Sequence, residues 1–207
     1  MMILGLTGSI GMGKSWGSQC FRHFGIRVHD ADACVHRLMG PGGTAVQEVD
    51  KAFPGVMMAQ GGVDRQKLGA QVLNDDANLQ KLEAILHPQV RADQKRFLAR
   101  ASRDRKPLVV LDIPLLFETG ARSRVDAVVV MSAPERLQRQ RVLHRPGMTE
   151  DKFEAILERQ TPDALKRQLA HFIVSTGGPK GEALRQIRNI VKVTKTWPAV
   201  AWSPHWS

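Results

Sequence analysis

Short apolar runs alternate along the chain with longer stretches in which apolar residues recur every three or four positions. Unbroken runs rich in β-branched residues predict strands that are buried on both faces, as in a parallel sheet. Five such strands are expected, at Met2–Thr7, Ile26–Asp30, Leu108–Asp112, Val125–Met131 and Phe172–Val174.

The three- and four-residue spacing predicts amphipathic helices between and after these strands. They are expected at Lys14–Phe24, Ala33–Met39, Thr44–Phe53, Asp64–Leu73, Asp76–Leu86, Pro88–Ser102, Pro134–His144, Glu150–Gln160 and Gly181–Lys195. Asp64 is expected to cap its helix, and Pro88 to stand in the first turn of a new one. Most of these helices form one large insertion between the second and third strands. A smaller, arginine-rich insertion separates the fourth strand from the fifth.

This alternation predicts an α/β fold in which helices cover both faces of a parallel sheet. A length of 207 residues suits one such domain with insertions better than two independent domains. The last segment, TWPAVAWSPHWS, holds three of the four tryptophans and two prolines, and we interpret it as an irregular tail.

The composition is that of an ordinary soluble protein, with 43% hydrophobic and 24% charged residues. A formal charge of +10 favours anionic partners, namely nucleic acid, anionic lipid or phosphorylated metabolites, although a solvated basic surface explains it as well. Cys20 and Cys34 lack metal or redox spacing and are expected to be reduced and buried. No signal-peptide core and no apolar stretch of ~20 residues is found, so we expect a cytoplasmic protein.

A phosphate-binding motif directly follows the first strand. The pattern G-x-x-x-x-G-K-[ST] is matched by Gly8, Ser9, Ile10, Gly11, Met12, Gly13, Lys14 and Ser15. Glycines let backbone N–H groups surround a phosphate, the lysine places its charge on the β- and γ-phosphates, and the serine hydroxyl binds Mg²⁺. The helix that follows aims its N-terminus at the same anion. The sequence therefore predicts a site for ATP and Mg²⁺.

Carboxylates close two of the predicted strands. Asp112 ends the third strand and is the candidate for the second magnesium-side carboxylate; the alternative is a capping or turn aspartate after a strand. Asp30 and Asp32 close the second strand in D-A-D, where alternate residues share a face. One of them, with Asp32 preferred, would accept the proton of an attacking hydroxyl. The alternative is helix capping before Ala33–Met39.

Arginines crowd the small insertion at Arg136, Arg139, Arg141 and Arg145. Arginines that close over a transferring phosphate stabilise its charge, so one or two of these are expected at the site, Arg145 first. The others would be solvated. His87, between Leu86 and Pro88, is structural or a ligand contact.

Taken together, these motifs resemble the dephospho-coenzyme A kinase family. The similar segments are GLTGSIGMGKS (5–15), DAD (30–32), LHP (86–88), DIPLLFE (112–118) and RVLHRPGMTEDKF…RQ (141–160). The phosphate loop alone indicates only a nucleotide-hydrolysing or kinase fold, whereas DIPLLFE in register with the other segments discriminates between families.

The resemblance implies a P-loop NTPase fold with a three-layer, parallel-sheet core, a helical substrate-binding insertion and a small helical lid. The core would comprise residues 1–30, 108–133 and 171–196, the insertion 31–107, the lid 134–170 and the tail 197–207. The family transfers the γ-phosphate of ATP to the ribose 3′-hydroxyl of dephospho-coenzyme A, the last step of coenzyme A synthesis.

Roles follow from the matching motifs. Asp32 would be the general base, and Lys14 and Arg145 would hold the transferring phosphate. Arg141 would contact the nucleotide, and Ser15 with Asp112 would hold Mg²⁺. On the acceptor side, contacts would come from Asp32, His87, Leu115, Leu116 and Phe117. Departures from the family pattern are Trp16, where threonine is usual, and His171 and Ser175, where aspartate and asparagine are usual.

Three alternatives remain open at this point. Another P-loop kinase, for a nucleoside monophosphate or a metabolite such as shikimate, would share the loop and the lid. A nucleic-acid-binding P-loop ATPase would use the positive charge, but the sequence lacks basic segments interleaved with aromatic residues. An inactive relative would bind nucleotide only. We expect an active kinase that is a monomer or weak homo-oligomer, with no membrane and no specific nucleic acid among its partners.

Overall fold

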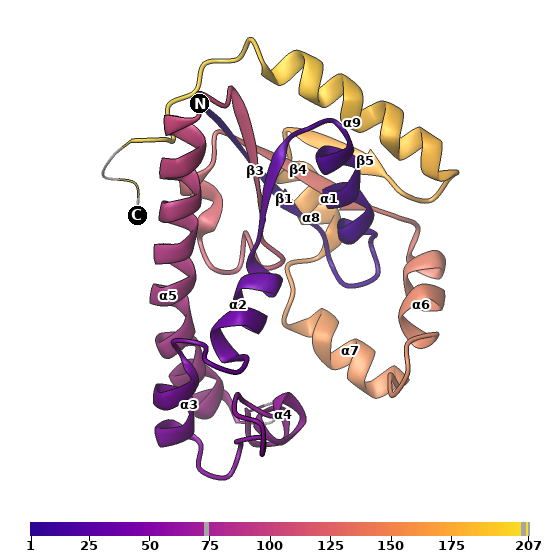
Figure 1. The fold of residues 1–207 in the computed structure, drawn as a ribbon. Helices are drawn as coiled ribbons and strands as arrows, with labels where there is room; N and C mark the ends of the chain where they lie inside the picture. The colour runs from indigo at the N-terminus through magenta and orange to yellow at the C-terminus, as the bar shows by residue number, and fades with distance from the viewer. Residues whose placement is uncertain (73–74, 204–205, 207) are drawn as a thin grey trace. The chain divides into compact units, whose positions relative to one another are not determined.

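The structure is a computed structural model, and it describes residues 1–72, 75–203 and 206. In this part of the chain, five strands form one sheet in the order β2-β3-β1-β4-β5 (Figure 1). They are β1 (Met2–Thr7), β2 (Arg27–Asp30), β3 (Leu108–Asp112), β4 (Ala127–Ser132) and β5 (Phe172–Ser175). The pairs β1–β3, β1–β4 and β4–β5 are parallel, as the sequence predicts. Because β1 and β3 are neighbours, their carboxyl ends meet at one edge of the sheet.

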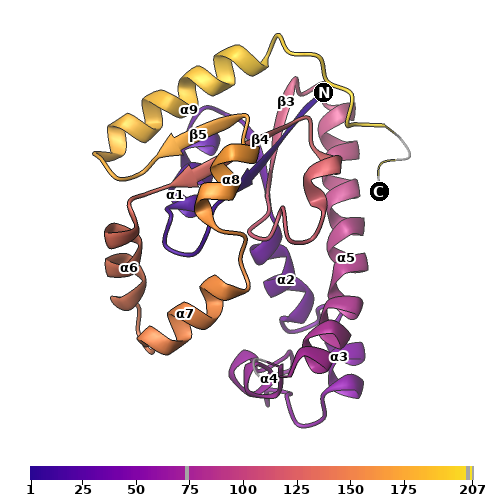
Figure 2. The same cartoon turned by 180° about the vertical axis from the view of Figure 1, so that it is seen from behind.

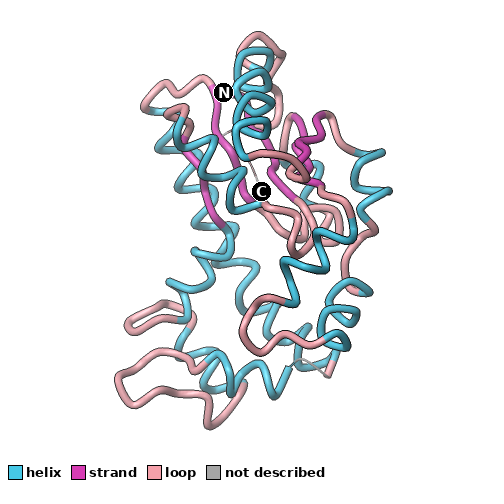
Figure 3. Tube along the Cα trace, turned by 90° about the vertical axis from the view of Figure 1, so that its right-hand side faces the viewer, coloured by secondary structure: helices cyan, strands magenta, loops and turns pink. Residues whose placement is uncertain are grey.

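The chain divides into two compact units, Met1–His29 with Leu98–Ser207, and Asp30–Phe97. The first unit holds α1 (Lys14–His23), α6 (Glu135–Leu143), α7 (Glu150–Glu158), α8 (Asp163–Leu169), α9 (Lys180–Thr194) and the 3₁₀ turn η1 (Ala121–Arg124). The second holds α2 (Ala31–Met39), α3 (Val46–Ala52), α4 (Arg65–Val72) and most of α5 (Asp76–Arg103). Figure 3 shows that helices and loops make up nearly all of this second unit.

The core of the first unit lies between the sheet and helices. Alternate residues of β1, β3 and β4 turn one face toward α1 and α9, where Phe21 and Ile187 are fully buried. On the other face α8 packs on β4, and Figure 2 shows α8 in front of the sheet that α1 covers from behind. The result is a sheet between two layers of helices, which confirms the predicted α/β class.

The second unit has an apolar core of its own, which includes Val49, Phe53, Leu68 and Leu86. Asp64 caps α4 as predicted, because its carboxylate accepts hydrogen bonds from the N–H groups of Gln66 and Lys67. The two helices predicted on either side of Pro88 are wrong. They are one helix, α5, with Pro88 in its interior.

Two elements were not predicted, the short helix α8 and the turn η1. The tail contains no helix or strand in its described part, but it is bound to the core. The Asp126 carboxylate accepts hydrogen bonds from the N–H groups of Ile3, Val200 and Ala201, and the Trp206 indole donates to the Arg124 carbonyl. Among the helices of the described residues, none is both long and apolar enough to cross a membrane.

Candidate nucleotide-binding site

The phosphate loop occupies the turn between β1 and α1. Gly13 is the N-cap of α1 and has a φ of 84°, and Gly11 has a φ of 77°, which are left-handed conformations that favour glycine. A Cβ on Gly11 would lie 2.6 Å from a methyl group of Val142, so this glycine also lets α6 approach the loop. The first turn of α1 carries no acidic residue and no side-chain cap, which leaves its positive end to an anion.

Lys14 and Asp112 meet at the shared carboxyl edge of β1 and β3. Asp112 is 1% exposed, and its Oδ1 accepts a hydrogen bond of 2.6 Å from the Lys14 ammonium group. Its other oxygen accepts from the hydroxyl of Ser18, one helical turn after Lys14. Ser15 is exposed in the same turn of α1. The structure therefore brings the predicted lysine and carboxylate together, and adds Ser18, which the motif does not contain.

The arginines on and just after α6 have different surroundings. Arg141 donates to the carbonyls of Gly11 and Thr176 and to the Thr176 hydroxyl, so its guanidinium lies directly beside the phosphate loop. Arg139 forms an ion pair with Glu150 across the α6–α7 hairpin. Arg145 is exposed just after α6 ends. The sequence could not separate these three environments.

The DIPLLFE segment begins at the last residue of β3 and contains both buried and half-buried side chains. Leu116 is fully buried and fills the space that a side chain on Gly5 would need. Leu115 and Phe117 are half-buried. Of the three residues of this segment that were proposed for the acceptor side, Leu116 thus belongs to the core of the first unit.

Glu118, the last residue of that segment, binds a lysine that sequence reasoning missed. The ammonium group of Lys166 on α8 lies 3.0 Å from Glu118 Oε1, and the Lys166 side chain is 0% exposed. The same carboxylate oxygen accepts a 2.7 Å hydrogen bond from the N–H of Thr161. Burial alone would raise the pKa of Glu118. Its carboxylate, however, accepts hydrogen bonds from its own N–H, from the Thr161 N–H and from Lys166, and together these hold the pKa below its usual range.

This depressed pKa predicts a loss of stability in acid. The contribution of Glu118 is fully present above the pKa that it has in the unfolded chain, and it is lost as pH falls through the lower folded-state pKa. In urea unfolding at a series of pH values, wild type should exceed Glu118→Gln in free energy of unfolding near pH 7. The difference should shrink as pH falls below about 4. A difference independent of pH would contradict this assignment.

In the second unit, the two aspartates of DAD do not share a strand face. Asp30 ends β2 and is the N-cap of α2, with its carboxylate accepting from the N–H of Ala33. Asp32 lies one residue inside α2 and is exposed. The capping role considered for Asp32 therefore belongs to Asp30, because the helix starts two residues earlier than predicted. His87 is half-buried in the interior of α5.

The three departures from the family pattern fall in distinct places. Trp16 packs against the core under α1, and the ammonium group of Lys180 lies 5.1 Å from its ring centroid. His171 precedes β5 and lies beside Arg122. Its pKa is lowered, mainly because the side chain is partly buried and also because the positive charge of Arg122 is close. Since His171 precedes the amino end of β5, it lies at the edge of the sheet opposite the phosphate loop. Ser175 ends β5 and is exposed.

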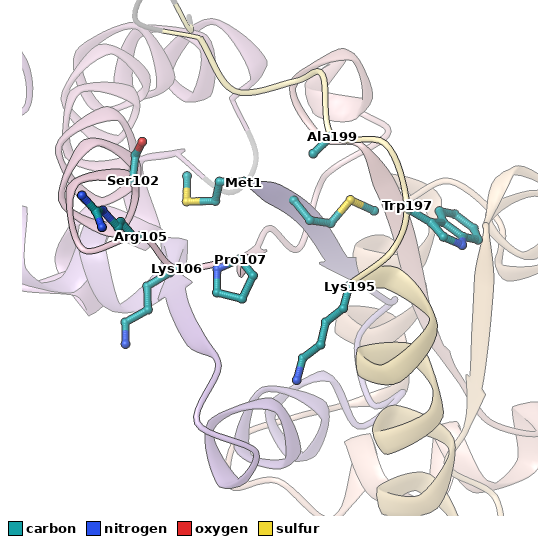
Figure 4. Close-up of a pocket in the computed structure, with 9 residues that line it drawn as sticks. Met1, Ser102, Arg105, Lys106, Pro107, Lys195, Trp197 and Ala199 are labelled. Atoms are coloured by element: carbon teal, nitrogen blue, oxygen red, sulfur yellow. The ribbon is translucent and has the colours of Figure 1, made fainter.

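A separate hollow of about 340 Å³ lies at the amino-terminal edge of the sheet (Figure 4). It is lined by the start of β1, the segment that precedes β3, and the beginning of the tail, including Arg105, Lys106 and Lys195. Since phosphate loops stand at the carboxyl ends of parallel strands, this hollow is not the nucleotide site.

Comparisons with known proteins place the chain in a family. Residues 2–180 match the family model described as dephospho-CoA kinase. A dephospho-CoA kinase of Mesorhizobium japonicum is 58% identical over 177 residues, which are 86% of this chain and 88% of that protein. The chain belongs to the dephospho-CoA kinase family. This confirms the family that the sequence motifs indicated.

Solved structures share the fold of this chain. The crystal structure of TT1252 from Thermus thermophilus has a TM-score of 0.79 at 32% identity, covering 93% of this chain and 96% of that one. A dephospho-CoA kinase from Campylobacter jejuni has a TM-score of 0.63 with 93% and 96% covered, and at 21% identity this likeness shows the fold alone.

Proposed function

We propose that this protein phosphorylates the ribose 3′-hydroxyl of dephospho-coenzyme A with ATP and Mg²⁺, giving coenzyme A and ADP. The observation that carries the proposal is the family match over residues 2–180. In the same chain, Lys14 of the phosphate loop donates a hydrogen bond to the buried Asp112. Family members named for the same reaction span most of this chain.

The proposed nucleotide site is the loop Gly8–Ser15. Its backbone N–H groups and the N-terminus of α1 would bind the β-phosphate, and Lys14 would place its charge between the β- and γ-phosphates. Arg141, already beside Gly11, would contact the nucleotide. Arg145 would offset charge on the transferring group from the lid.

The donor set near the loop fits Mg²⁺, which prefers hard oxygen ligands and keeps several of its waters. Ser15 would hold the ion through its hydroxyl and Asp112 through its carboxylate. Held there, the ion would supply positive charge that offsets the negative charge developing on the phosphates during transfer.

Asp32 is the proposed general base. As the ribose oxygen attacks the γ-phosphorus in line, the O–H bond breaks and the proton passes to the Asp32 carboxylate, while the bond to the β–γ bridging oxygen breaks and ADP leaves. His87, Leu115 and Phe117 would contact the acceptor, with Leu116 supporting them from the core. The insertion 31–107 and the lid 134–170 are proposed to close on the substrates and exclude water.

The test is the product. Purified protein with Mg·ATP should release ADP only when dephospho-coenzyme A is added, and mass spectrometry should find coenzyme A. ATP binding without this product would overturn the acceptor assignment, and other hydroxyl acceptors such as shikimate would then be screened.

We further propose that the reaction takes place in the cytoplasm and that the enzyme is a monomer or weak homo-oligomer without a nucleic-acid partner.

A further inference from the structure

Two glutamines hold one residue of the phosphate loop from both sides. The Gln138 side chain donates a 2.7 Å hydrogen bond to the carbonyl of Ile10. The N–H of the same Ile10 donates a 3.0 Å hydrogen bond to Oε1 of Gln160. Both backbone groups of Ile10 are thereby bound by side chains of the lid.

The two glutamines stand at opposite ends of the α6–α7 hairpin. Gln138 is on α6 and only 4% exposed, and Gln160 follows the end of α7. An N–H group that donates to Gln160 is directed at the protein and does not line the phosphate cradle. The hairpin therefore fixes the course of the loop at Ile10, while the N–H groups that follow remain for the anion.

The position of Gln160 is itself held by buried polar contacts. The next residue, Thr161, donates its N–H to Glu118, which pairs with the fully buried Lys166. Two residues further on, the Asp163 carboxylate accepts a 2.7 Å hydrogen bond from Ser132 at the end of β4. Such contacts tie the carboxyl end of the hairpin to the sheet, so that Gln160 has a defined place from which to reach Ile10.

We propose that Gln138 and Gln160 are positioning residues that set the shape of the phosphate loop through Ile10, so that ATP affinity depends on where the lid stands. This proposal rests on the proposed function only in taking ATP as the ligand of the loop. If the hairpin swings outward, both hydrogen bonds break and the loop loses the constraint. When the hairpin is seated, the loop is preorganised for the phosphates.

The test uses Gln138→Met and Gln160→Met, which keep the side-chain length and remove one hydrogen bond each. Gln140→Met is the matched control, because Gln140 is on the same helix but exposed. Calorimetric titration of Gln138→Met and of Gln160→Met with Mg·ATP should show a five- to tenfold rise in Kd, roughly the effect of one lost hydrogen bond. Binding of dephospho-coenzyme A alone should change by less than about twofold, and Gln140→Met should bind both like wild type.

Equal ATP affinity in wild type and both variants would overturn the proposal. So would an equal loss of affinity for both substrates, because that pattern indicates general unfolding. Gln160→Asn is a second variant for the case that Gln160→Met fails to fold. It keeps the amide group, but the shorter side chain does not reach Ile10, so its affinity for ATP should fall by a similar factor. Wild type that binds ATP but forms no coenzyme A would refute the proposed function and leave this binding test intact.

Discussion

Replacing Asp32 by asparagine is expected to lower turnover by about 100-fold or more while leaving ATP affinity nearly unchanged. Asparagine has the same shape as aspartate but cannot accept the proton of the attacking ribose hydroxyl. Asp32 is exposed in the first turn of α2 and does not serve as the cap of that helix, so the substitution should not unfold the second unit. The measurement is steady-state kcat with both substrates saturating, together with calorimetric binding of Mg·ATP.

Asp30→Asn is the matched control two residues away. Asp30 caps α2 through its side chain, and asparagine caps a helix about as well as aspartate does. Turnover of Asp30→Asn should therefore stay within about fivefold of wild type. Near-normal turnover of Asp32→Asn would remove Asp32 from the role of base, and a large loss in Asp30→Asn alone would transfer that role to Asp30.

Much of the sheet could be predicted because its strands follow one strong rule. In a parallel sheet both faces are covered, so each central strand is an unbroken apolar run, and Leu108–Asp112 was located to the residue. The glycines of the phosphate loop could also be predicted, since the left-handed backbone that Gly11 and Gly13 adopt strongly favours glycine.

The α8 helix escaped prediction because its pattern is inverted. Its buried residue is Lys166, while Leu165 and Leu169 are 43% and 48% exposed. A search for apolar periodicity expects leucines to face the core and lysines to face water. It therefore cannot find a helix whose buried contact is the ion pair between Lys166 and Glu118. The roles of Gln138 and Gln160 could not be predicted either, because both side chains bind backbone groups of Ile10 and such contacts do not appear in a hydrophobic pattern.

The break predicted at Pro88 failed for a related reason. Proline removes one backbone hydrogen bond and usually ends a helix, which costs about 3 kcal/mol in isolation. Within α5, Leu82 and Leu86 before the proline are buried in the core of the second unit. Leu98 and Ala101 beyond it are fully buried in the first unit. Burial at both ends of one continuous helix outweighs the lost hydrogen bond, and local sequence cannot report that balance.

Replacing Asp112 by asparagine is expected to be the second most damaging change, with a fall in kcat of about 100-fold. The half-saturating Mg²⁺ concentration should rise by about 10- to 100-fold. The buried carboxylate accepts from Lys14 and Ser18 at once, so it orients the lysine that would face the phosphates and supplies negative charge near the proposed metal. Asparagine keeps the volume but loses the charge. Mg²⁺ titrations of the initial rate measure both effects.

Ser18→Ala separates the two functions of this carboxylate. It removes only the hydroxyl that donates to Asp112, leaving the charge and the contact with Lys14 in place. One lost hydrogen bond of this kind should change kcat by less than about tenfold without moving the Mg²⁺ midpoint. If Ser18→Ala shifted that midpoint as far as Asp112→Asn does, the carboxylate would act on the metal through its orientation by Ser18. If neither variant shifted it, Asp112 would serve Lys14 alone, and the ion would depend on Ser15 and the phosphates for its place.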